Sequence, residues 1–293
     1  MSSVRRLLRV SMTTADAGRT EAFYRDALGF ELAAREERAG ETFAALAGLP
    51  GARASVTVLR LGEEAVELVA FAKPGRSYPA GSTSFDLWFQ HIAIVVSKMD
   101  DAYARLSATP GWTAISTAGP QRLPESSGGV TAFKFRDPEG HPLELLQFQP
   151  GKVPPTWQGR HSDGPCLGID HSAIVVAETT ASMTYYRQLG FAVADTSLNR
   201  GEEQEHLDDA PGAVVEVTAL AVPGAPGPHL ELLCYRHPRG RPAPPMASND
   251  VAATRLILET DNNSLRRRPA TLLHDPDGHD LFLRAFAADE TSE

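Results

Sequence analysis

The feature that most constrains this chain is an internal repeat. The apolar run HIAIVV at residues 91–96 returns almost letter for letter as HSAIVV at residues 171–176. Each run precedes a segment with apolar residues at helical spacing, and then a second apolar run that carries one glutamate, Glu144 or Glu231. A repeat of this length decides the type of fold before any single residue does.

Further motifs recur in the same order. The helix end FYRDALGF at 23–30 matches YYRQLGF at 185–191, and the turn DPEGH at 137–141 matches DPDGH at 275–279. Together the motifs predict four repeats, the last of them truncated and degenerate. Their predicted ranges are 1–72 and 89–149 in a first pair (1–149), a Pro/Gly-rich linker at 150–166, and 167–236 and 250–286 in a second pair (167–293).

These motifs resemble those of the vicinal oxygen chelate superfamily, which includes glyoxalase I, extradiol dioxygenases and bleomycin-resistance proteins. The resemblance implies an α+β fold built from βαβββ modules, here four with a truncated fourth. It also implies that two modules join their curled sheets into a cup around a metal site. One scaffold hosts many chemistries, so the resemblance implies the fold more strongly than the reaction.

Alignment of the repeats assigns two ligand positions to each module. The second and third modules carry a histidine and a glutamate each, whereas the first and fourth modules do not. The positions are Arg9 and Glu67, His91 and Glu144, His171 and Glu231, and Arg255 and Phe282.

Module pairing decides which of these residues meet. Pairing in chain order would put one unwanted cation into each cup. Pairing module 2 with 3 and module 1 with 4, for which domain-swapped glyoxalases and their tandem fusions give precedent by resemblance, collects two histidines and two glutamates in one cup. We therefore predict a fused pseudo-dimer with one complete inner site and one decayed outer site, where Glu67 pairs with Arg9 or Arg255 in place of a metal.

The inner set His91, Glu144, His171 and Glu231 has the chemistry of a metal site. Two imidazoles and two carboxylates suit one divalent ion such as zinc, nickel, cobalt, iron or manganese. The alternative is a pair of core histidines satisfied by the backbone, but carboxylates inside apolar strands need compensation. The glyoxalase resemblance implies that Glu144 or Glu231 is also catalytic and moves a proton at the substrate.

Other polar residues have less specific interpretations. His141 and His279 are predicted to be turn and packing residues, and His229 is a weaker candidate for a supporting or acid–base role. Lys134 and Arg136 either bind an anionic group or, as we expect, lie on a solvated sheet edge. The loop 121–129 is either a substrate lid or a surface connection, and residues 199–209 form a dense polar insert.

Three functions remain open. A metal-dependent lyase or isomerase of the glyoxalase type, acting on a small molecule with vicinal oxygens, is favoured by the four-residue ligand set. An extradiol-type ring-cleavage dioxygenase needs two histidines and one carboxylate on Fe(II), so the second glutamate argues against it. A non-catalytic small-molecule binding protein of the antibiotic-sequestering kind would lack the ligands altogether.

Composition excludes several partner classes. The formal net charge is −9 with no basic stripe, which argues against nucleic acid and anionic membranes. No stretch approaches the roughly 20 apolar residues that span a bilayer, and the N-terminus lacks a signal-peptide core. Two cysteines give no disulfide framework. We expect a cytoplasmic protein, monomeric or homodimeric, with a small-molecule substrate.

Overall fold

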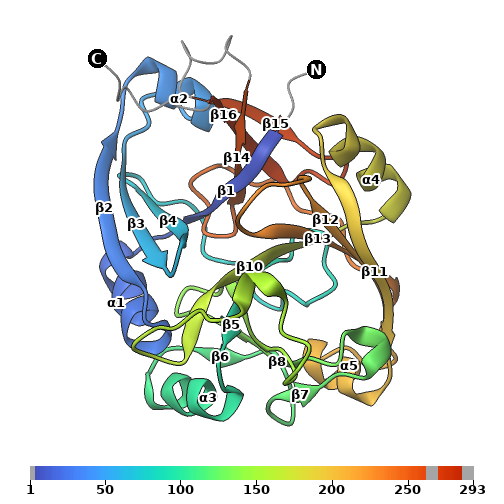
Figure 1. The fold of residues 1–293 in the computed structure, drawn as a ribbon. Helices are drawn as coiled ribbons and strands as arrows, with labels where there is room; N and C mark the ends of the chain where they lie inside the picture. The colour runs from blue at the N-terminus through green and yellow to red at the C-terminus, as the bar shows by residue number, and fades with distance from the viewer. Residues whose placement is uncertain (1–3, 262–269, 286–293) are drawn as a thin grey trace, which may run out of the picture.

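The strands of the computed structural model, which describes residues 4–261 and 270–285, form two mixed sheets that curl without closing (Figure 1). The seven-stranded sheet has the order β15 (Thr271–His274), β16 (Asp280–Ala285), β14 (Thr254–Thr260), β1 (Val4–Thr13), β4 (Glu64–Phe71), β3 (Ala54–Leu61) and β2 (Glu31–Arg38). The nine-stranded sheet has the order β11 (Ala192–Arg200), β12 (Val214–Ala221), β13 (His229–His237), β10 (Cys166–Val175), β5 (Gln90–Val96), β9 (Pro142–Gln147), β8 (Thr131–Arg136) and β6 (Thr113–Ala114), with β7 (Gln121–Arg122) paired to β8.

The strand order follows the predicted pairing of modules. Strands of the second and third repeats share the nine-stranded sheet, where β5 and β10 run antiparallel as central neighbours. Strands of the first and fourth repeats share the other sheet, where β1 and β14 take the equivalent places. Every residue of β5 is buried, which is why its sequence is a continuous apolar run rather than an alternating one.

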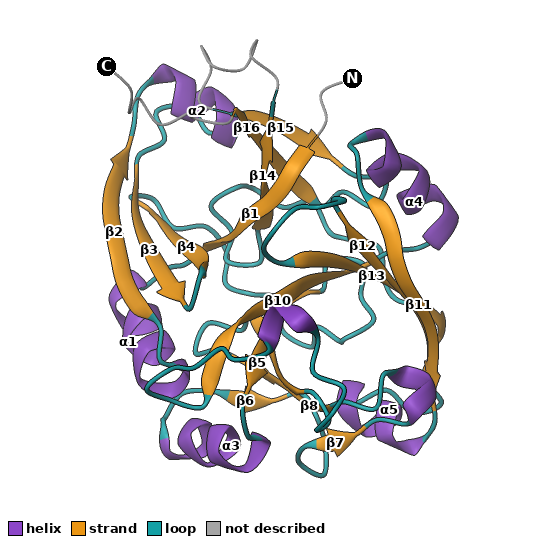
Figure 2. Ribbon diagram, viewed as in Figure 1, coloured by secondary structure: helices purple, strands orange, loops and turns teal. Residues whose placement is uncertain are grey.

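The helices lie at the periphery of the sheets (Figure 2). The first begins at its cap Asp16, whose side chain accepts from Arg19 N, and ends at Gly29 with φ 79°, a left-handed conformation that favours glycine. The helical spacing of apolar residues predicts helices at 17–28, 99–109 and 180–189, and α1, α3 and α4 agree with these ranges within a residue at each end. The helices are α1 (Ala17–Leu28), α2 (Glu41–Ala47), α3 (Met99–Ala108), α4 (Thr179–Gln188) and α5 (Glu202–Asp208), with 3₁₀ turns η1 (Glu125–Ser127) and η2 (Pro155–Trp157).

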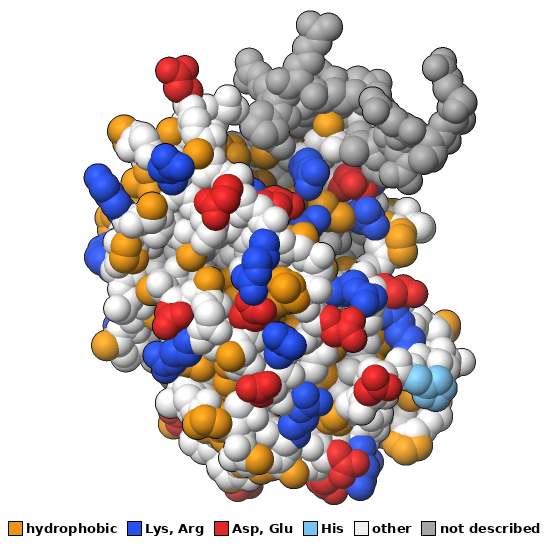
Figure 3. All heavy atoms as spheres, turned by 90° about the vertical axis from the view of Figure 1, so that its left-hand side faces the viewer, with side chains coloured by type: hydrophobic (Ala, Val, Ile, Leu, Met, Phe, Trp, Pro, Cys, Tyr) orange, Lys and Arg blue, Asp and Glu red, His pale blue; other side chains and the backbone are white. Residues whose placement is uncertain are grey.

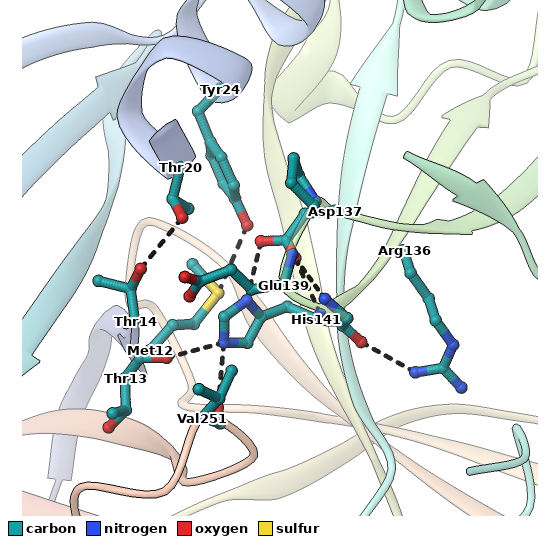
Figure 4. Close-up of polar contacts among 12 residues, drawn as sticks. Met12, Thr13, Thr14, Thr20, Tyr24, Arg136, Asp137, Glu139, His141 and Val251 are labelled. Atoms are coloured by element: carbon teal, nitrogen blue, oxygen red, sulfur yellow. Dashed lines mark hydrogen bonds and ion pairs between the residues drawn. The ribbon is translucent and has the colours of Figure 1, made fainter. Parts of the chain in front are cut away.

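The repeated DPxGH turns tie one sheet to the other, and Figure 4 shows the contacts of the first turn. Asp137 Oδ1 accepts from the backbone N–H groups of the turn, and the Glu139 carboxylate accepts from Ala15 and Asp16 N at the start of α1. His141 Nε2 lies 2.9 Å from Thr13 O at the end of β1. The turn of the nine-stranded sheet therefore packs against the first strand and helix of the seven-stranded sheet.

The second copy of the turn, at 275–279, makes the equivalent contact in the opposite direction. It belongs to the seven-stranded sheet and packs against the nine-stranded sheet. His279 Nε2 lies 2.8 Å from Val175 O at the end of β10, and Asp277 Oδ2 accepts from Ala177 N, just before α4. The Tyr186 hydroxyl on α4 donates to Asp275 Oδ2 at 3.1 Å. Both histidines are buried, so their interpretation as turn and packing residues agrees with the structure.

Charges of both signs are interspersed on the face that carries β2 and α1 (Figure 3). The strand β2 is exposed along almost its whole length and forms a sheet edge, and its charged residues keep such an edge from pairing with another chain. Among the described residues, the helices are all too short or too polar to cross a bilayer.

Candidate metal centre

The four predicted ligands lie on the four central strands of the nine-stranded sheet, in the order β13, β10, β5 and β9. Ala93 on β5 is opposite both His171 and Glu144, and Ala173 on β10 is opposite both His91 and Glu231. This register relates the two halves of the sheet by an approximate two-fold symmetry. The four side chains come from both halves of the chain and meet because β5 and β10 are neighbours.

Three of the four side chains converge closely. One ligand atom each of His91, Glu144 and His171 lies within 4.8 Å of the other two. Glu231 is one step further out: its Oε2 lies 3.4 Å from His171 Nε2. His91 and Glu144 are nearly completely buried, whereas the side chain of Glu231 is 20% exposed towards the cavity described below.

The histidines are not satisfied by the backbone, as core histidines would be. Both ring nitrogens of His91 and Nε2 of His171 are buried without a hydrogen-bond partner among the described residues. His91 Nε2 lies 2.8 Å from Glu144 Oε2, but the contact lacks hydrogen-bond orientation. Unpaired buried nitrogens are costly. Imidazole nitrogens that converge beside a carboxylate fit a divalent cation, which His91, His171 and Glu144 would hold.

Burial and charge act on the first pair in opposite directions. Burial lowers the pKa of His91 more than the adjacent Glu144 raises it, so the ring favours the neutral form that binds a metal. Burial would raise the pKa of Glu144, but His91, Lys134 and His171 together hold it below its ordinary value. The pair thus presents a neutral imidazole and a carboxylate.

The second pair is electrostatically different. Burial would lower the pKa of His171, but Glu231, Asp170 and Glu144 outweigh it and raise the pKa to about 9. Burial would likewise raise the pKa of Glu231, but His171 and His229 lower it to about 2. Without a metal, His171 therefore carries a proton at neutral pH, and a cation that binds there must displace it.

Asp170 supports His171 and was not among the sequence candidates. Its Oδ2 lies 3.0 Å from His171 Nδ1, which leaves Nε2 to face the centre, and its Oδ1 accepts from Trp157 Nε1 at 2.7 Å. A carboxylate on the far nitrogen commonly orients a metal-binding histidine. The available signal was a charged residue inside an apolar strand, directly before the histidine.

The linker before β10 takes part in this support. Arg160 lies over the Trp157 ring at 4.4 Å and donates to Glu64 of the seven-stranded sheet at 2.8 Å. Glu64 also accepts from Ile169 N, next to Asp170. The weak candidate His229 reaches the same group, with Nε2 3.4 Å from Glu231 Oε1 and Nδ1 3.8 Å from Asp170 Oδ2.

The site opens into a cavity of about 770 Å³. Residues of β8, β9 and the loop 121–129 line it, together with residues of β11, β12, β13 and α5. The loop therefore lines the cavity through Leu123 and Ser127, both buried. Its opening and closing as a lid stays a prediction. A volume of this size suits a small organic molecule.

The expectation of a solvated edge at Lys134 is wrong. Lys134 is 4% exposed, lines the cavity, and its ammonium donates to Asp208 Oδ1 at 2.6 Å. Asp208 comes from α5, which lies within the predicted polar insert 199–209. Arg136 is half-buried and donates to the carbonyls of Gly140 and Ser82, so it holds a turn. The sequence around Lys134 gives no sign of its pairing with Asp208, because Asp208 lies far along the chain on α5.

The outer cup is closed. Its cavity measures only about 10 Å³ and is lined by Phe43 and Leu46 of α2. Glu67 is held by Arg38, with both oxygens at 2.9 Å, and Arg9 is 4.0 Å away. The expected ion pair therefore exists, but its main partner is Arg38 on the edge strand β2.

Arg255 of the outer cup has other partners than the predicted Glu67. Its guanidinium donates to Thr13 Oγ1 at 3.0 Å and to the Ser248 carbonyl, and it lies 5.7 Å from the centre of the Phe282 ring. Arg255 is therefore held by hydrogen bonds from its guanidinium, and Phe282 packs against it.

Known proteins share this architecture. Residues 6–145 match the family model described as the Glyoxalase/Bleomycin resistance protein/Dioxygenase superfamily. Glyoxalase I from Zea mays aligns over 96% of this chain and 92% of its own at 15% identity, with a TM-score of 0.60. A putative dioxygenase from Bacillus subtilis aligns over 97% and 86% at 12% identity, with a TM-score of 0.58. No curated protein matches the sequence.

Proposed function

We propose that this chain, whose residues 6–145 match the model of the Glyoxalase/Bleomycin resistance protein/Dioxygenase superfamily, is a metal-dependent lyase or isomerase of the glyoxalase type. Its substrate is a small molecule with two adjacent oxygens, and its one active site lies between the second and third modules. The observation that carries the proposal is the set of unpaired buried imidazole nitrogens beside the carboxylates of Glu144 and Glu231.

The geometry supports different roles for the two glutamates. Glu144 lies with both histidines in the tight group, so we assign His91, His171 and Glu144 as the primary ligands. Glu231 is a more distant ligand that can leave the group and face the cavity. A bound divalent ion such as zinc, nickel, cobalt, iron or manganese would polarise the adjacent substrate oxygens and acidify the neighbouring C–H bond.

Glu231 is then the residue that accepts the substrate proton. Its side chain is 20% exposed and faces the cavity, which gives a substrate carbon access to its carboxylate. Asp170 positions His171 through its contact with Nδ1. The chemistry of an isomerase needs one group that removes a proton and returns it, which Glu231 can do alone.

The dioxygenase alternative has one specific observation in its favour. Two histidines and one carboxylate in a tight group are the ligand set of non-haem Fe(II) oxygenases. If Glu231 does not bind the metal, this reading gains support. Oxygen uptake with catechols by the iron-loaded protein separates the two reactions, because an isomerase consumes no oxygen. A binding protein without catalysis would not need the ionised Glu231.

Metal analysis of protein purified without chelator tests the shared site. We expect one divalent ion per chain in the wild type, and loss of at least nine-tenths of it in each of the variants His91→Ala, His171→Ala and Glu144→Gln. Glu231→Gln should keep most of the metal but lose isomerase activity at least a hundredfold.

The exposed His161 provides the matched control for this test. His161→Ala should keep full metal content, since its side chain lies outside the cavity-lining set. Full occupancy in either His91→Ala or His171→Ala would contradict a single site shared by both modules.

A further inference from the structure

A second polar cluster adjoins the metal centre and is centred on Asp208. The side chain of Asp208 is fully buried, and its Oδ1 accepts from Lys134 Nζ at 2.6 Å. Its Oδ2 accepts from the Tyr235 hydroxyl at 2.7 Å and from Gln204 Nε2 at 2.6 Å. One carboxylate therefore orients three side chains, all of which line the cavity.

Contacts between the two modules fix this cluster beside the metal centre. The end of α5 is held by Ser116 Oγ, which donates to Leu207 O at 2.9 Å, and by Thr117 N, which donates to His206 O at 2.8 Å. Lys134 is directly opposite Glu144 in the pairing of β8 with β9. The cluster and the metal centre are therefore linked through neighbouring residues of β8 and β9.

Gln204 lines the cavity and has an unpaired acceptor. Its orientation is determined, because the Asp208 carboxylate requires the amide N–H₂ on its side. The Oε1 atom therefore points away from Asp208. Gln204 is only 4% exposed, and its Oε1 is buried without a hydrogen-bond partner among the described residues. A buried acceptor left unpaired is unfavourable, so a ligand that donates a hydrogen bond there is favoured.

The charge of the cavity selects against anions. Among the described residues that line it, the Lys and Arg side chains are Lys134 and Lys152 alone. Lys134 is paired with Asp208, and Lys152 is paired with Glu125 at the rim. A carboxylate or phosphate on the ligand would therefore meet no unpaired lysine or arginine among these lining residues, which also include Glu231 and Asp170.

We propose that Gln204, Lys134 and Tyr235 form a subsite for a hydroxyl group of an uncharged substrate. The hydroxyl donates to Gln204 Oε1 and accepts from an N–H of Lys134 that Asp208 does not use. The substrate class is then a neutral oxygenated molecule with a hydroxyl in addition to its two adjacent oxygens. This inference rests on the proposed function, because it places the adjacent oxygens at the metal centre.

Three related pyranones test the subsite. Kojic acid, allomaltol and comenic acid share one metal-chelating pair of oxygens and differ only across the ring, with a hydroxymethyl, a methyl and a carboxylate group. Calorimetric titration of each into the metal-loaded protein should give kojic acid the highest affinity. We expect about three- to tenfold over allomaltol, the size of one net hydrogen bond, and weaker binding still of comenic acid.

The variant Gln204→Leu should bind kojic acid and allomaltol with equal affinity while its metal content stays unchanged. Thr196→Val is the matched control, because Thr196 lines the same cavity on β11 outside the Asp208 cluster, and it should keep the preference. The comparison of the three ligands on the wild type needs no variant and holds even if Gln204→Leu fails to fold.

Different outcomes separate this inference from the proposed function. Equal affinities for kojic acid and allomaltol, tightest binding of comenic acid, or a preference that survives Gln204→Leu would overturn the subsite while leaving the metal centre in place. Absence of metal from the wild type, with none of the three ligands bound, would overturn the proposed function and the subsite with it.

Discussion

His171 is the residue at which charge and metal binding compete. Asp170 lies on one ring nitrogen and Glu231 beside the other, and these carboxylates favour the protonated ring. The same carboxylates would attract a cation into the centre. A metal must therefore release one proton from His171, whereas the depressed pKa of His91 means that its ring needs to release none.

This competition predicts a pH dependence of metal affinity. Below the His171 pKa of about 9, protons occupy the ligand, so affinity should rise about tenfold per pH unit between pH 6.5 and 8.5. Competition with a chelator of known affinity measures the slope. Asp170→Asn removes one negative charge from the ring, lowers the His171 pKa, and should make the slope shallower. A slope of zero in the wild type would mean that His171 is not a ligand.

At the scale of elements, the first DPxGH turn connects the two sheets and contains a titratable residue, His141. His141 Nδ1 lies 2.8 Å from Asp137 Oδ2, and Nε2 faces the carbonyls of Thr13 and Val251. Both ring nitrogens thus face acceptors only, which favours the doubly protonated ring. Burial opposes this, but Asp137 and Glu139 outweigh it and raise the pKa of His141 to about 8 from 6.5.

The raised pKa has a definite consequence for stability. The contribution of the protonated ring is fully present below pH 6.5 and is lost as pH rises through 8, and the shift corresponds to about 2 kcal/mol. Urea unfolding of wild type and His141→Gln should therefore give a stability difference that is largest near pH 6 and smaller by about 2 kcal/mol near pH 9. The exposed His161→Gln is the control; a difference that grows with pH would contradict the assignment.

The short helices α2 and α5 occupy equivalent places in the two cups. They follow the edge strands β2 and β11 and begin after Gly40 and Gly201. In the outer cup, α2 contributes Phe43 and closes the cavity. In the inner cup, α5 lines the cavity with Gln204 and Leu207, and the cavity stays open. The side chains of this helix thus decide whether it closes the cavity of a cup or lines an open one.

At the scale of the molecule, the metal centre joins the two halves of the chain. His91 and Glu144 come from the first half, and His171 and Glu231 come from the second. A ligand that binds only the native state stabilises it by mass action, by about 4 kcal/mol when its concentration is a thousand times the Kd. In the proposed site, a bound metal would therefore act as a cross-link between the halves.

Removal of the metal should accordingly lower the melting temperature of the whole chain by several degrees. Differential scanning calorimetry of protein with and without a chelator measures this, and restored metal should reverse the change. His91→Ala should melt at the same temperature under both conditions. An equal loss of stability on chelator treatment in His91→Ala would show that the stabilising ion binds elsewhere.

The α+β fold, the bounds of helices such as α1, the repeat, and the candidate set His91, Glu144, His171 and Glu231 could be predicted from the chain alone. They follow from periodicity and from residues that an apolar strand does not tolerate unpaired. The pairing of Glu67 with Arg38, of His171 with Asp170 and of Lys134 with Asp208 could not be predicted in this way. The reason is physical: such partners come from edge strands and short helices whose positions depend on packing between modules, and no local pattern records it.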